Sequence, residues 1–198
     1  MEGIVSNIRK RYLKAFSSYV KSAKETPFFT SDLVVIGVID RSIGLVEAMP
    51  ALIASENIHA FAPLLRVQLD GLLRLHALRI VKDRESLAGH IVKGNSLRDY
   101  RSDGKRLTDR YLVNSLKDEL PWVESMYDTL CGWVHFSESH IFSSVSEGKE
   151  DRTIEIGIGE YRKKLKPQLL KETIGATEAV HNAIATIAEA YFALPRHL

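Results

Sequence analysis

Two groups of residues in this 198-residue chain have side chains and spacings that could support chemistry. The first is a row of alternating charges, Arg66, Asp70 and Arg74, which follow one stripe of a helix because they are four residues apart. The second lies between positions 127 and 140, and its polar members include Tyr127, Asp128, Cys131, His135, Ser137 and His140. Arginine binds carboxylate or phosphate, and histidine titrates near neutral pH. If the two segments meet inside one bundle, they form a polar cleft for an anion or for acid–base chemistry.

The charged row has two interpretations. It lies within residues 61–81, which are mostly apolar, and charges buried there are costly unless they are paired. In the structural interpretation, the row forms an ion-pair network that fixes the register of the helices. In the functional interpretation, the arginines bind a phosphate or carboxylate ligand. The candidate partners within the chain are Asp40, Glu47, Glu124 and Asp128.

His135 also has two interpretations. It could act as a general acid or base, with Tyr127, Ser137 and His140 close in sequence, or it could be a hydrogen-bonded residue at a helix end. Asp128, Cys131, His135 and His140 in the same segment could also be read as a set of metal ligands. Their spacing matches no zinc signature, so we predict neither a metal nor a cofactor. We expect the lone cysteine to be a small core residue.

Composition predicts one ordinary globular domain, residues 1–198, because 45% of the residues are hydrophobic and 26% are charged. The formal net charge of +2 is close to neutral, so the overall field selects no partner. Basic residues gather in the first helix and at 98–110 and 162–166. Acidic residues alternate with the basic ones at 98–110, a pattern that favours a solvent-exposed face. The sequence does not decide whether the basic clusters bind RNA. Nucleotide-binding, zinc-protease and hydrolase motifs are missing, so the common sites of these classes lack support.

Location is predicted from the cysteine count and the apolar tracts. Cys131 is the only cysteine, so no internal disulfide can form. The N-terminal segment is basic without an uninterrupted apolar core, and therefore does not resemble a secretory signal. The longest apolar tract, residues 33–53, is interrupted by Asp40, Arg41, Glu47 and Pro50. We expect a cytoplasmic protein outside the membrane.

Apolar periodicity predicts an all-α fold, a single bundle of about six to seven helices with a small β-hairpin before the C-terminal helix. The expected helices cover residues 2–24, 30–57, 62–82, 85–93, 107–120, 121–134 and 167–194. Pro50 should kink or break the second helix, and Pro63 should lie in the first turn of the third. The hairpin is expected at about 139–159, with strands at 141–145 and 153–158.

Two short motifs give the chain a resemblance to a known class. They are Arg66-Val-Gln-Leu-Asp70 on one helix and an aromatic-to-histidine helix end that runs from Tyr127 to Ser137. Over residues 31–144 the chain resembles a family of uncharacterised, mostly bacterial, all-helical proteins related in outline to HEPN-like bundles. Catalytic HEPN members are metal-independent ribonucleases of toxin and defence systems, with four to six residues between an arginine and a histidine.

The chain departs from that catalytic pattern. Asp128, Thr129 and Leu130 occupy the places of the arginine that would precede His135. The bare spacing occurs once elsewhere, between Arg84 and His90 on a short helix. An inactive binding or interaction domain is at least as compatible with this pattern as a ribonuclease.

We therefore predict a binding or interaction module, as in bacterial stress or defence systems. Its polar cleft would be formed by Arg66, Asp70, Arg74, Tyr127 and His135, with Ser137 and His140 beside it. The alternative is a ribonuclease in which His135 is the general acid or base and Arg66 or Arg74 stabilises phosphate charge, or else one that uses Arg84 and His90. Related bundles often pair, so we expect a homodimer through the first or last helix. A protein partner or RNA stays open.

Overall fold

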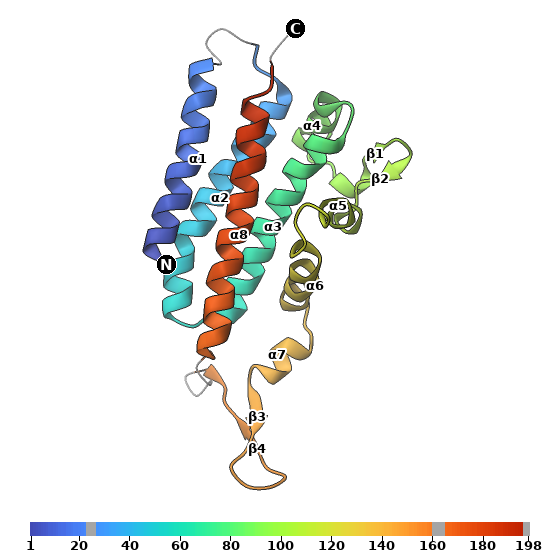
Figure 1. The fold of residues 1–198 in the computed structure, drawn as a ribbon. Coiled ribbons are helices and arrows are strands. Elements are labelled where there is room, and N and C mark those ends of the chain that lie inside the picture. Colours follow the sequence, from blue (N-terminus) through green and yellow to red (C-terminus); the bar gives the residue numbers. More distant parts are fainter. Residues whose placement is uncertain (23–26, 160–164, 196–198) are drawn as a thin grey trace.

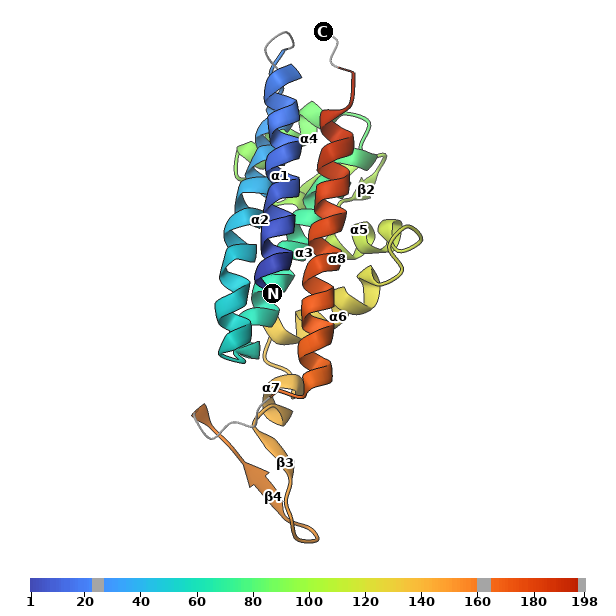
Figure 2. The same cartoon turned by 60° about the vertical axis from the view of Figure 1, so that its left-hand side comes forward.

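The structure is a computed structural model that describes residues 1–22, 27–159 and 165–195. Long helices lie side by side in an elongated bundle (Figures 1 and 2). They are α1 (Glu2–Ser22), α2 (Thr30–Ala54), α3 (Ile58–Ile80) and α8 (Pro167–Phe192). The shorter helices follow α3 in the chain and are α4 (Arg84–Val92), α5 (Asp109–Leu116), α6 (Val123–Val134) and α7 (Glu138–Phe142), with a 3-10 turn at Leu97–Asp99. The prediction of an all-α bundle is confirmed.

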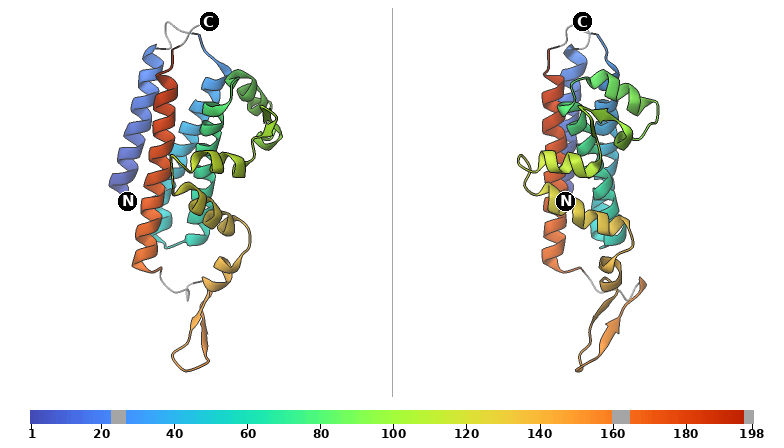
Figure 3. Two further views of the ribbon diagram at one scale, coloured as in Figure 1. Left: turned by 45° about the vertical axis from the view of Figure 1, so that its right-hand side comes forward. Right: turned by 90° about the vertical axis from the view of Figure 1, so that its right-hand side faces the viewer.

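Helix α3 lies at the centre of the molecule. It contacts α2, α4, α5, α6 and α8, and its side chains Leu69, Leu72 and Leu73 are fully buried. Figure 3 shows the segment from α4 to α6 gathered on one side of the long helices. Helix α2 has apolar residues on nearly all sides, and α1, α3, α4 and α8 all contact it. It continues through Pro50 to Ala54 and does not break at the proline.

The start of α3 differs from the prediction. The helix begins at Ile58, one turn earlier than expected, because the Asn57 side chain accepts a hydrogen bond from the Ala60 amide at 3.3 Å and caps the helix. Pro63 therefore lies inside the helix and not in its first turn. The expected end of the first helix, residues 23–24, lies outside the described residues.

A buried polar cluster links the long helices. The Tyr12 hydroxyl of α1 lies 2.8 Å from Nδ1 of His181 in α8, and Nε2 of Gln68 in α3 lies 3.0 Å from Nε2 of the same ring. Gln68 also donates to the backbone carbonyl of Ser42 in α2, at 3.2 Å. Burial lowers the pKa of His181 to about 4, so this ring is neutral at physiological pH. The cluster links four helices through buried polar contacts, and such contacts favour one relative arrangement of the helices.

An arm projects from the end of the bundle (Figures 1 and 2). We use this name for residues 136–158, which contain α7, β3 (Val145–Glu147) and β4 (Ile154–Ile156). The strands form an antiparallel hairpin in which Val145 lies opposite Ile156. The predicted hairpin is thus present. Its first strand was placed too early, because Ser137 and His140 form a capping box that makes Glu138–Phe142 helical.

A second, very short hairpin was not predicted. Strands β1 (Arg101–Ser102) and β2 (Lys105–Arg106) pair around Asp103 and Gly104, whose φ angles are +49° and +77°. Asp-Gly is the favoured sequence for a two-residue turn with positive φ at both positions, so the signal was present in the sequence.

The described residues contain no helix long and apolar enough to span a bilayer.

Candidate functional site

The charged row of α3 meets an acidic residue from α5. Arg66 donates to Oδ2 of Asp109 at 2.7 Å, and Arg74 lies 3.5 Å from Oδ1 of the same carboxylate. Arg74 also pairs with Asp70 at 2.8 Å, and Arg41 of α2 lies 3.5 Å from Asp70. The row is therefore one ion-pair network that joins α2, α3 and α5.

Asp109 is the partner that sequence reasoning missed. It is the first residue of α5, and the Thr108 side chain, which accepts from the Tyr111 amide at 3.2 Å, caps that helix. The predicted partners lie elsewhere. Glu47 pairs with Arg9, both Glu124 and Asp128 pair with Arg110, and Asp40 is exposed on α2. A helix was predicted over residues 107–120, but nothing in the sequence indicated that its acidic first turn would face the arginines of α3.

Tyr127 of α6 completes this network. The guanidinium of Arg66 lies 4.5 Å from the centre of its ring, and that of Arg110 lies 5.1 Å from it. Burial opposes the charge on Arg66, but Cys131 and Asp109 outweigh this effect and raise its pKa. Burial, reinforced by Cys131, raises the pKa of Tyr127. The arginine therefore stays charged and the tyrosine stays protonated, a combination that suits structural pairing better than proton transfer.

His135 lies away from this network. It follows the last residue of α6, and its side chain is exposed, with no hydrogen bond or ion pair to any residue that the structure describes. Eight residues separate it from Tyr127, which at the rise of an α-helix places it about 12 Å further along the axis. The structure brings Tyr127 to Arg66 but shows no contact between His135 and the charged row.

Ser137 and His140 have local roles at the start of the arm. The Ser137 hydroxyl donates to the Gly132 carbonyl at 2.7 Å, and the Ser137 amide donates to Nδ1 of His140 at 3.3 Å. These bonds end α6 and begin α7, so both residues fix the direction in which the chain enters the arm.

Aromatic rings surround His140. Its ring centre lies 5.1 Å from that of Trp133, 5.5 Å from that of Phe136 and 5.6 Å from that of His59. Phe136 remains 83% exposed despite this stacking. A pocket of about 760 Å³ lies beside the cluster, and its apolar lining residues are Ile58, Trp133, Phe142, Val145, Ile156, Leu165 and Leu169. Concave apolar space and exposed rings therefore occur together at the base of the arm.

Arg84 and His90, the alternative pair, have separate surroundings. Nε2 of His90 lies 2.9 Å from the carbonyl oxygen of Ser96, and the His90 ring contacts the Tyr100 ring edge-on. Arg84 lines a polar pocket of about 620 Å³ between α2, α4 and α8. Six residues apart on a helix, the two side chains point about 120° away from each other.

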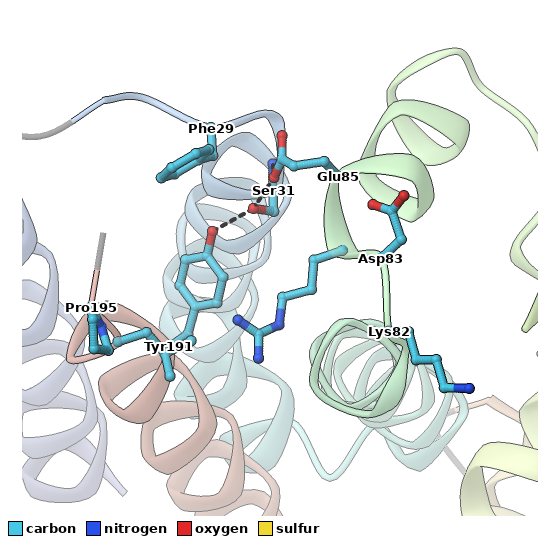
Figure 4. A pocket seen from close by; sticks show the side chains of 9 residues that line it. Phe29, Ser31, Lys82, Asp83, Glu85, Tyr191 and Pro195 are labelled. Atoms are coloured by element: carbon cyan, nitrogen blue, oxygen red, sulfur yellow. Dashed lines mark hydrogen bonds between the residues drawn. The ribbon is translucent and has the colours of Figure 1, made fainter. Parts of the chain in front are cut away.

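The carboxylate of Glu85 organises the pocket that Arg84 lines. It accepts from the amides of Thr30 and Ser31, at 2.7 and 3.0 Å, and from the Ser31 hydroxyl. That hydroxyl lies 2.6 Å from the Tyr191 hydroxyl (Figure 4). Burial alone would raise the pKa of Glu85, but the Ser31 and Thr30 donors lower it below its ordinary value. An internal carboxylate thus already occupies the N-terminus of α2.

Among the residues that the structure describes, no three His, Cys, Asp or Glu side chains converge as metal ligands would.

Comparisons with known proteins do not identify a family. No protein-family model, no curated protein and no solved structure matches the chain. The resemblance to HEPN-like bundles therefore stays a prediction, and function must be argued from the geometry alone.

Proposed function

We propose that this chain is a protein-interaction module and that its arm is the binding surface. One observation carries the proposal: the arm leaves the bundle with its large apolar side chains facing solvent. The exposed fractions are 83% for Phe136, 70% for Phe142, 65% for Ile154, 63% for Ile156 and 75% for Ile158. Taking roughly 200 Å² for each large residue, the exposed areas of these five add up to about 700 Å².

The charged row supports this proposal as a structural element. Arg66 and Arg74 share the carboxylate of Asp109, and Arg74 also pairs with Asp70, so both arginines already have anionic partners within the fold. The network attaches α5 to α3, while Tyr127 attaches α6. Since α6 leads directly into α7, the network holds the segment from which the arm extends. We assign the row to positioning the arm.

The proposal can be tested by site-specific photo-crosslinking in cells that express the chain. A photoreactive residue at Phe142 should yield covalent adducts with protein. The same residue at Val92, which is 55% exposed on α4, should not. Adducts at neither position, or equal adducts at both, would contradict a binding role for the arm.

The alternative activity, a metal-independent ribonuclease, is tested on the same purified protein. His135 is exposed at the end of α6, next to the exposed ring of Phe136, where a base could stack. A ribonuclease would cleave labelled RNA in EDTA and lose this activity on His135→Ala, or on His90→Ala if the α4 pair acts. The interaction module shows no cleavage in any of the three proteins.

A further inference from the structure

We infer that the partner of the arm is a second copy of this chain, joined through antiparallel pairing of the two β4 strands centred on Ile156. This inference rests on the proposed interaction function and names its partner. It moves the expected homodimer interface from the first or last helix to the arm.

The outer edge of β4 is available for such pairing. In the hairpin, the Gly157 amide donates to the Ser144 carbonyl at 2.9 Å and the Gly148 amide donates to the Thr153 carbonyl at 2.8 Å. Backbone groups alternate between the two edges of a strand, so those of Ile154 and Ile156 point away from β3. They have no partner within the part of the chain that the structure describes.

A free edge of this kind is a template for another strand. A two-stranded hairpin alone is marginally stable in water, and this one lies beyond the end of the bundle, where α7 contacts β3 (Figure 1). Adding strands would stabilise the arm in the projecting conformation that the structure shows.

The sequence of the strand is complementary to itself in one register. If two β4 strands pair antiparallel with Ile156 opposite Ile156, then Ile154 lies opposite Ile158 of the second copy. The three isoleucines share one face, because side chains alternate with a period of two. Glu155 lies opposite Gly157 of the second copy, so the register places no like charges directly against each other.

The exposed apolar area is also of the right size. About 700 Å² on each copy approaches the roughly 800 Å² that each partner buries in a standard interface. The antiparallel arrangement directs the tip of each arm toward the base of the other arm, where Phe136 and Phe142 are exposed. Two copies related by a two-fold axis would thus cover the same surface on both chains.

Disulfide crosslinking tests the register in a Cys131→Ser background. Residues directly opposite in a hydrogen-bonded antiparallel pair have Cα atoms about 5.5 Å apart, within the range of a disulfide. Ile156→Cys should therefore form covalent dimers on mild oxidation. Ile154→Cys alone should not, because its two copies would lie about 13 Å apart along the strands. A mixture of Ile154→Cys and Ile158→Cys proteins should crosslink to each other.

The outcomes separate this inference from the function on which it rests. Failure of Ile156→Cys to crosslink, or equal crosslinking by Ile154→Cys alone, overturns the β4 pairing. If Phe142 probes then still capture another protein, the interaction function stands with a different partner. If neither experiment gives adducts, both the pairing and the function are wrong.

Discussion

Asp109 connects the charged row of α3 to α5, and its carboxylate serves two arginines at once. Arg66 is the less exposed of these, with 14% of its side chain accessible, so loss of its partner leaves a largely buried charge uncompensated. The need for such a partner was predictable from an apolar helix that carries two arginines. The identity of the partner was not, because a residue from a polar stretch forty positions away reaches Arg66 only through the path of the folded chain.

We predict that Asp109→Asn lowers the free energy of unfolding by about 2 kcal/mol, because Arg66 stays buried without its anion. Asp128→Asn is the matched control. This change breaks the ion pair between Asp128 and Arg110, two side chains that are each about half exposed. It should lower the free energy of unfolding by less than about 1 kcal/mol. Urea unfolding at neutral pH measures both changes. Equal losses in the two variants would show that the row is not the stabilising network described.

The buried ring of His181 predicts a dependence of stability on pH. Its pKa is about 4 in the fold and near 6.5 in the unfolded chain, so protons bind the unfolded state more readily between these values. The stabilisation is complete above pH 6.5 and is lost as the pH falls toward 4. For this one residue, the loss is on the order of 3 kcal/mol.

His181→Gln should flatten the pH dependence of unfolding between pH 6.5 and 4. His76→Gln should remove a further part, because burial and the nearby Arg79 lower the pKa of His76 to about 4 as well. Denaturant unfolding at several pH values provides the measurement, and the slope is the quantity to compare. An unchanged slope in His181→Gln would mean that this ring does not titrate as a buried group.

At the scale of elements, periodicity was informative where a helix has a buried stripe or is buried all round, as in α2, α3 and α8. It failed where local capping decides the structure. Residues 141–145 were predicted as a strand, but the reciprocal bonds of Ser137 and His140 start a helix that covers residues 138–142. The Asp-Gly turn between β1 and β2 is a signal that we overlooked; the cap of α2 by Glu85 is a tertiary contact that no local pattern predicts.

That cap gives a prediction for α2 itself. Glu85→Gln removes the charge beside the first amides of α2 and weakens the bonds that the Thr30 and Ser31 amides donate to this side chain. We expect a loss of about 1 kcal/mol, typical of a helix cap, and faster hydrogen exchange in the first turn of α2. Glu2→Gln, which changes an exposed carboxylate at the start of α1, is the control. The absence of any faster exchange at the start of α2 would contradict the capping role.

At the scale of the molecule, the bundle and the arm have different character. The bundle closes its core and pairs its buried charges, whereas the arm exposes its largest side chains and one strand edge. The sequence predicted the all-α bundle and the presence of a hairpin, but it placed the chemistry in a cleft that would join the charged row to His135. In the structure, Tyr127 of α6 contacts the charged row, whereas His135 lies at the far end of the same helix. Where apolar surface remains exposed is visible only in the folded chain.

Sedimentation velocity tests association through the arm most directly. The wild-type chain should sediment as a dimer whose population grows with concentration. Ile156→Lys, which places two charges at the proposed axis, should sediment as a monomer with an unchanged melting temperature. Val92→Lys, on an exposed site of α4, should behave as the wild type does. A wild-type chain that stays monomeric at all concentrations, or a Val92→Lys variant that dissociates as Ile156→Lys does, would contradict the account.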